Sequence, residues 1–403
     1  MSRFNVFSNH PIIPNSQEYV VEKKYVSINS EDRDVLKYPN SNEFEIELPQ
    51  DYLNVSTVKL ATWSFPSNYN TFSLSLGNTT MTFQFNELYN PGEHGMVDPL
   101  QDAIFDALYN YVNPETGTSD FLVSIQEGFY NPTQLATELT NRFNAVITNY
   151  LILKLDPSLT PSFVADGGYT QFVVVYNEVS QDLWFGNRSS SFILTNEFQI
   201  ATKQQKGTLC INKNMLPDAS QWGLPANLGF TPCNAYSLTT SDIGAARFYY
   251  GSVTVGDNGY WLLPDPDLSG SQISFLKAPY KLNNMGPAYF YMEIAGLNCL
   301  DETSPFNVSE FTRHTNETNG VVNSAFAKIS VVSTPLSQWF DLGMDPFKYF
   351  NPPAERIRKL KIKLRYHNGE LVNFGKFNYS FMLEFTMFSP QNIRTKTTVQ
   401  SYV

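Results

Sequence analysis

The chain has 403 residues, of which 15% are aromatic and only 16% charged, and its formal net charge is −11. This length allows one large domain or two ordinary ones, and the aromatic content favours sheets over helical bundles or disorder. The acidic balance argues against general nucleic-acid binding, because a negative surface repels phosphate backbones.

The cysteines and the N-terminus indicate the cellular compartment in which the protein matures. Cys210, Cys233 and Cys299 are far apart and odd in number, which indicates free buried thiols rather than a disulfide framework or a zinc site. Free thiols point to maturation in a reducing compartment. The first residues lack a signal-peptide core, and no run approaches the roughly 18 apolar residues of a membrane span. We therefore expect a soluble protein that is not secreted.

The first third of the chain is expected to contain an arm and three strands. Residues 1–24 are polar with scattered apolar anchors, which predicts an extended arm that orders on a neighbouring subunit, or a disordered tail. Alternation over residues 44–48 predicts a half-buried strand that ends at Pro49. The apolar residues of 58–65 change phase, which indicates either burial on both faces or a bulge. A third strand is expected at residues 81–85.

Two helices are expected to interrupt the strands. Asp98-Pro99 is a favourable helix start, and apolar residues then repeat at helical spacing as far as Val112. Asn131-Pro-Thr-Gln134 resembles a capping box, and the apolar residues after it predict a helix over residues 131–150. The remaining strands are expected at Phe121–Ile125, Phe172–Tyr176, Ser191–Leu194, Arg247–Val255, Ile273–Leu276, Tyr289–Ile294 and Phe326–Val332.

The stretch over residues 354–388 has the pattern of a β-hairpin. Its first strand alternates apolar and basic residues from Arg358 to Tyr366, and its second strand alternates apolar residues from Tyr379 to Met387. The Asn368-Gly369 pair between them suits a turn. We expect the second strand to pair with residues 43–48, and the basic strand to lie in the opposite sheet.

Many strands, few helices and long loops without a repeat predict a mainly β protein, a jelly-roll sandwich with a large insertion that carries two short helices. The expected domains are an arm at residues 1–24, a jelly-roll domain over 25–388 with an insertion around 90–250, and a polar tail at 389–403. Whether the chain holds one β-domain or two stays open at this point.

Patterns that carry catalysis or bind metal are missing from the sequence. His10, His94, His314 and His367 do not lie within ligand spacing of one another, and no nucleophile elbow or phosphate-binding glycine loop occurs. We therefore expect no enzymatic activity, no cofactor and no metal site.

One cluster of basic residues stands out in the acidic chain. Its six cations are Arg356, Arg358, Lys359, Lys361, Lys363 and Arg365. Such a row is either a solvated sheet face that blocks unwanted strand addition, or a docking surface for an acidic partner or anionic lipid.

Two stretches of the chain carry longer motifs. The first begins with Asn29-Ser-Glu-Asp-Arg-Asp34 and continues with Tyr38-Pro-Asn-Ser-Asn-Glu-Phe44. The second is Gly369-Glu-Leu-Val-Asn-Phe374 followed by Asn378-Tyr-Ser-Phe-Met-Leu-Glu-Phe385. The first is similar to the opening, and the second to the closing strands, of the minor capsid proteins of nucleocytoplasmic large DNA viruses. Weaker echoes occur at 127–139 and 228–230, whereas residues 150–250 match nothing that we can name.

The resemblance implies a jelly-roll subunit of an icosahedral virion that is assembled in the host cytoplasm. Its implied partners are the major capsid protein, other minor capsid proteins and the inner viral membrane surface, with no specific nucleic acid, and a homo-oligomer is a further option. We expect a structural minor capsid protein that joins capsomers. The alternatives are a penton subunit at the fivefold vertex and a glycan-binding spike module, which would need a cleft with paired carboxylates or an aromatic platform.

Overall fold

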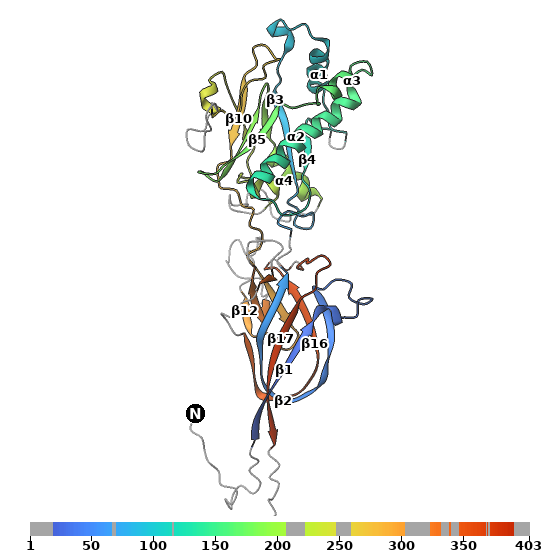
Figure 1. The fold of residues 1–403 in the computed structure, drawn as a ribbon, viewed down its shortest axis with the longest axis vertical. Coiled ribbons are helices and arrows are strands. Elements are labelled where there is room, and N and C mark those ends of the chain that lie inside the picture. Colours follow the sequence, from blue (N-terminus) through green and yellow to red (C-terminus); the bar gives the residue numbers. More distant parts are fainter. Residues whose placement is uncertain are drawn as a thin grey trace, which may run out of the picture. The chain divides into compact units, whose positions relative to one another are not determined.

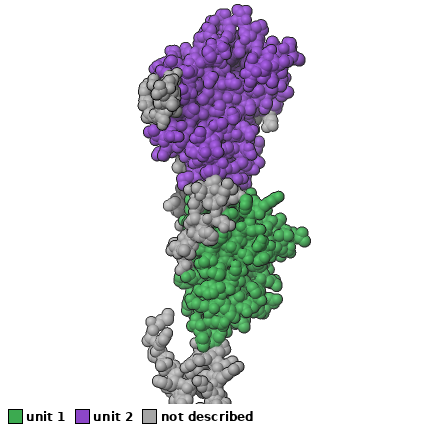
Figure 2. Space-filling view, in the orientation of Figure 1, with its two compact units in different colours: residues 1–69, 287–403 green, residues 70–286 purple. Residues whose placement is uncertain are grey.

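The chain divides into two compact units, which Figure 2 colours separately. Unit 1 combines Met1–Tyr69 with Pro287–Val403, and unit 2 is Asn70–Gly286, so unit 2 is inserted in sequence between the two parts of unit 1. The computed structural model describes residues 19–66, 70–114, 117–206, 222–246, 259–302, 323–331, 338–339, 346–367, 369 and 371–390. The strand expected at Arg247–Val255 lies outside the described residues.

Unit 1 is built around one curled antiparallel sheet (Figure 1). Its strand order is β1-β17-β2-β16-β11-β14. β15 pairs with β2, and β12 and β13 form a separate pair. The elements are β1 (Tyr19–Asn29), η1 (Ser30–Asp32), β2 (Glu43–Pro66), β11 (Tyr289–Ile294), β12 (Leu300–Glu302), β13 (Asn323–Ala325), β14 (Ala327–Ser330), β15 (Gln338–Trp339), β16 (Phe347–Arg365) and β17 (Ser380–Pro390). β1 includes residues 19–24 of the expected arm.

Strand β2 is the centre of this sheet. It was expected to end at Pro49, but it continues to Pro66. The pairing with β16 is nevertheless irregular beside Pro49, which has no N–H to donate to the ladder. Further along, Met382 pairs with Thr62 and Leu383 with Leu60, so Ala61 is the extra residue of a bulge. Of the two readings of the phase change, the bulge is therefore confirmed.

The expected hairpin is wrong, because β16 and β17 are not neighbours and β2 lies between them. The expected pairing of the last strand is wrong as well: β17 pairs with β1 and with the later part of β2, whereas residues 43–47 pair with the basic strand in the same sheet. Apolar residues alternate with the same period of two in all these strands, so the period does not indicate which strand pairs with which. Opposite charges do favour the observed pair, since Glu45 lies opposite Lys361.

Aromatic residues fill the core on the inner side of the sheet. Tyr52 of β2 stacks on Phe385 of β17 with ring centroids 4.4 Å apart, and Phe65 packs edge-on against Phe290 of β11 at 5.0 Å. All four side chains are buried. Burying one such ring contributes about 1.5–3 kcal/mol, so these contacts hold the curled sheet together across strands that are distant in sequence.

Unit 2 contains two four-stranded sheets and most of the helices. The sheet orders are β4-β3-β7-β8 and β5-β6-β10-β9. The strands are β3 (Thr80–Glu87), β4 (Phe121–Ser124), β5 (Phe172–Asn177), β6 (Asp182–Asn187), β7 (Ser191–Leu194), β8 (Ala235–Tyr236), β9 (Leu238–Thr240) and β10 (Ile273–Lys277). The helices are η2 (Pro91–His94), α1 (Pro99–Tyr109), α2 (Pro132–Lys154), α3 (Thr160–Ala165), α4 (Asn196–Gln205), α5 (Leu224–Asn227) and η4 (Ile243–Ala246).

Both helix starts that local sequence predicts are confirmed. The Asp98 carboxylate accepts the Leu100 N–H at 3.0 Å, and the Asn131 and Gln134 side chains form a reciprocal capping box at the start of α2. The expectation of two short helices is wrong, because the described part of unit 2 contains five α-helices and α2 alone has 23 residues.

Two polar side chains on α2 take the place of a neighbouring strand for β5. The Asn144 amide donates to the Phe172 carbonyl at 2.8 Å and accepts the Phe172 N–H at 3.0 Å. One helical turn earlier, the Thr140 hydroxyl accepts the Val174 N–H at 2.8 Å. The edge of β5 that no strand covers is thus satisfied by a helix, which removes a template for aggregation.

We expect Asn144→Ala to lower the free energy of unfolding by about 1–3 kcal/mol, because the buried Phe172 N–H and carbonyl lose their partners. The matched control is Asn141→Ala on an exposed position of the same helix, which should change it by less than about 0.5 kcal/mol. Urea unfolding of the two variants checks this. Equal effects would show that α2 does not support the edge of β5.

Candidate interaction surface

The two stretches that resemble capsid proteins are hydrogen-bonded to each other in unit 1. Ser30 is fully buried, and its backbone N–H donates to the Tyr379 carbonyl at 2.8 Å while its hydroxyl accepts the Tyr379 N–H at 2.8 Å. The Arg33 guanidinium donates to the Ser30 carbonyl at 2.5 Å and to the Asn378 side-chain oxygen at 2.9 Å. We call Ser30, Arg33, Asn378 and Tyr379 the motif junction.

Further polar contacts extend the motif junction on both sides. Arg33 also donates to the carbonyls of Tyr38 at 3.0 Å and Pro39 at 3.1 Å, so one planar guanidinium fixes the turn after η1. The Ser41 hydroxyl donates to the Phe377 carbonyl at 3.2 Å, and the Asn42 amide donates to the Val372 carbonyl. The polar residues of both motifs therefore join the opening of the chain to its closing strands.

The predicted docking cations lie opposite a row of carboxylates on β2. Lys359 contacts Glu45 at 3.5 Å and Glu47 at 3.2 Å, and Lys361 contacts Glu43 at 3.2 Å. Arg356 and Arg358 both approach Asp51, at 3.0 and 3.9 Å, and Lys363 pairs in register with Glu43. Exposed ion pairs of this kind contribute about 0–1 kcal/mol each. The surface is therefore of mixed charge rather than a purely basic stripe.

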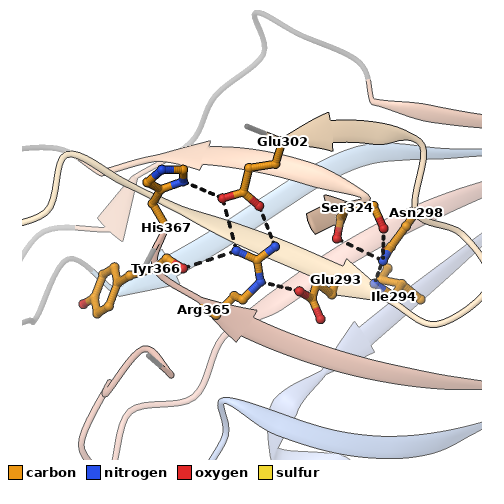
Figure 3. Close-up of polar contacts among 8 residues, drawn as sticks. All are labelled: Glu293, Ile294, Asn298, Glu302, Ser324, Arg365, Tyr366 and His367. Carbon is orange, nitrogen blue, oxygen red and sulfur yellow. Dashed lines mark hydrogen bonds and ion pairs between the residues drawn. The ribbon is translucent and has the colours of Figure 1, made fainter. Parts of the chain in front are cut away.

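The sixth predicted cation, Arg365, is buried in a cluster of charges (Figure 3). Its guanidinium donates to Glu302 at 2.6 and 3.2 Å and to Glu293, and its centre lies 5.2 Å from the Tyr291 ring. His367 Nδ1 lies 2.6 Å from the same carboxylate of Glu302. Burial alone would raise the pKa of Glu302, but the hydrogen bonds from Arg365 and His367 outweigh it and lower that pKa. The cluster ties β12 to the end of β16.

Three aromatic side chains are exposed on the side of the sheet away from the core. Tyr25, Phe347 and Tyr349 are 57%, 58% and 59% exposed. Tyr25 donates to Glu384 at 2.7 Å, and the register continues from Glu384 to Lys59 and on to Phe347. We call the outward side of β1, β17, β2 and β16 the outer face. It combines paired charges with exposed aromatic rings, and aromatic residues are enriched at protein interfaces.

The other residues considered in the sequence do not converge on one site. His94 stacks on Tyr89 in unit 2, His367 belongs to the Arg365 cluster, and His10 and His314 lie outside the described residues. Cys233 and Cys299 are free but exposed, so the expectation that they are buried is wrong; Cys210 is not among the described residues. Within the described ranges, no group of His, Cys, Asp and Glu could hold a metal ion, and no helix is long and apolar enough to cross a membrane.

Sequence reasoning missed the partners in these clusters. Glu302 and Glu293 carry no local motif, and Arg365 shares its period of two with the exposed Lys361, so alternation could not mark it as buried. Complementary charge spacing in residues 43–47 and 359–363 was the available signal for the β2–β16 pair.

No protein-family model matches the sequence, and no curated protein matches it. Among solved structures, a chain of the Sputnik virophage, determined by cryo-EM, is 10% identical with a TM-score of 0.37, over 91% of this chain and 98% of that chain. The mavirus penton protein is 7% identical with a TM-score of 0.36, over 93% of this chain and 100% of that chain. Both neighbours are viral proteins.

We expect Arg365→Met to lower the free energy of unfolding by about 3–5 kcal/mol, because it leaves Glu302 buried without its cation. Lys361→Met removes an exposed ion pair from the same strand and should cost less than about 1 kcal/mol. Chemical denaturation of both variants measures the difference. Similar losses would mean that the Arg365 cluster does not stabilise unit 1.

Proposed function

We propose that this chain is a structural, non-enzymatic subunit of an icosahedral virus particle of the large-DNA-virus kind. In this proposal unit 1 is a jelly-roll-type shell domain and residues 70–286 are its insertion. The motif junction carries the proposal: the residues by which the sequence resembles capsid proteins meet in one hydrogen-bonded cluster, although they lie at opposite ends of the chain. The pairing of β1 with β17 supports a single shell domain built from both ends of the chain, because the first and last strands are neighbours in one sheet.

The mechanism is binding through the outer face. Paired charges set orientation against a neighbour, and exposed rings such as Tyr349 supply the buried area on assembly. The partners that the resemblance implies are the major capsid protein and other minor capsid proteins, with the inner viral membrane surface as a further contact. The site of action is the virion, after assembly in the host cytoplasm.

Two positions in the particle remain as hypotheses, a minor capsid protein between capsomers and a penton subunit at the fivefold vertex. A penton subunit should form stable pentamers without other proteins, whereas a protein that joins capsomers should require its partners. Native mass spectrometry of the purified chain separates these two hypotheses. Absence of the chain from purified particles, measured by quantitative mass spectrometry, would contradict both.

The paired charges on the outer face allow a test of docking that controls for folding. Lys361→Glu alone places two carboxylates opposite each other and should lower both stability and particle yield. The reversed variant combines Lys359→Glu, Lys361→Glu and Lys363→Glu with Glu43→Lys, Glu45→Lys and Glu47→Lys, so the three cross-strand pairs are all kept with their polarity reversed. We expect the reversed variant to regain wild-type stability but to give at least tenfold fewer particles.

The two readouts are thermal unfolding of the isolated chain and the yield of particles after expression with the other capsid components. Wild-type particle yield from the stable reversed variant would favour the solvated-face reading of the basic strand. Tyr349→Ala, which removes an exposed ring and no charge, should likewise reduce assembly without affecting stability.

A further inference from the structure

Unit 2 contains a cleft that plays no part in the proposed role of the outer face. It has a volume of about 720 Å³ and is formed by the end of β3, η2, α1 and the start of β4. This volume lies within the range of small-molecule sites. Nine lining residues are aromatic or apolar and seven are polar. The first group is Phe85, Leu88, Tyr89, Pro91, Phe105, Leu108, Tyr109, Tyr111 and Phe121, and the second is Asn86, Glu87, Asn90, Glu93, Asp102, Asp106 and Ser119.

Stacked rings make the floor of the cleft rigid. Tyr111 stacks on Phe121 with ring centroids 3.7 Å apart, and Tyr89 packs on Phe105 at 5.2 Å while its hydroxyl donates to the Ser269 carbonyl at 2.5 Å. Burial raises the pKa of Tyr111 to about 12, so this phenol stays neutral. A floor held in this way is pre-organised, and a ligand does not have to order it.

Helix α1 contributes two carboxylates and one exposed aromatic ring to the lining of the cleft. Asp102, Asp106 and Tyr109 are spaced four and three residues apart, so they lie on one side of the helix. Tyr109 is 80% exposed although the other lining tyrosines are buried. An exposed ring beside carboxylates at the mouth of a cleft offers an apolar platform and hydrogen-bond acceptors to the same ligand.

Among the residues that the structure describes, the lining contains carboxylates and amides but no lysine, arginine or histidine. Carboxylates accept charge-assisted hydrogen bonds from hydroxyl groups, and the amides of Asn86 and Asn90 add both donors and acceptors. The same carboxylates repel anions, which argues against sialylated or sulfated sugars. We propose that this cleft binds a neutral carbohydrate, with Tyr109 stacked on the sugar ring and Asp102 and Asp106 bonded to its hydroxyls.

Saturation-transfer-difference NMR on the full chain tests the proposal, with the methyl glycosides of glucose, galactose, mannose, N-acetylglucosamine and N-acetylneuraminic acid as probes. We expect transfer to at least one neutral glycoside and none to N-acetylneuraminic acid. An acetylated trilysine amide serves as a competing probe, because a cation would also suit four carboxylates. Binding of the trilysine alone, or of no sugar, would overturn the proposal.

Variants then locate the site. Tyr109→Ala and Asp102→Asn should each weaken binding of the neutral glycoside at least tenfold, as measured by titration. Tyr236→Ala and Asp166→Asn are the matched controls, since both residues are exposed in unit 2 and neither lines the cleft. Circular dichroism confirms folding of each variant. Binding that survives both cleft substitutions would place the sugar elsewhere and contradict the assignment.

Discussion

Unit 1 depends on hydrogen bonding along both edges of β2. One edge is taken by β16 and the other by β17, and both strands come from the last 60 residues of the chain. Each backbone hydrogen bond adds only about 0.5–1.5 kcal/mol, so the sheet is stable because the two ladders also bury the aromatic core. The entropic cost of closing a loop rises by only about 0.6 kcal/mol for each doubling of its length, and an insertion of roughly 200 residues between these strands is therefore tolerated.

Local chemistry made part of the fold predictable from the sequence. The helix starts at Asp98 and Asn131 depend on neighbours within four residues. The bulge at Ala61 is visible in the sequence because the alternation of apolar residues changes phase there. Partner choice in a sheet is a long-range property. The hairpin pattern at residues 354–388 was assigned wrongly because two strands of equal period, with a turn between them, fit a hairpin equally well when a third strand separates them.

The same distinction holds for the candidate interaction surface. A period of two placed Lys361 and Arg365 on one side of β16, and both do face away from the core. Arg365 is buried because β12 places Glu302 against its guanidinium. The other basic residues lie beside the acidic row on β2, so that surface has mixed charge. The sequence predicted which residues each strand contains. The surroundings of each charged side chain depend on strands that are distant along the chain, and local patterns do not predict those.

The separation of β2 from its partners also orders events during synthesis. β2 is complete once residue 66 has been added, whereas β16 begins at Phe347. At about 5–20 residues per second, a ribosome needs roughly 15–55 seconds to make the intervening segment. Throughout that interval the strands that bury Phe44 and Leu60 have not been synthesised, whereas all the core residues of unit 2 become available. Slower elongation therefore prolongs the exposure of the nascent shell domain, and chaperones that shield apolar segments near the ribosome would act on β2 first.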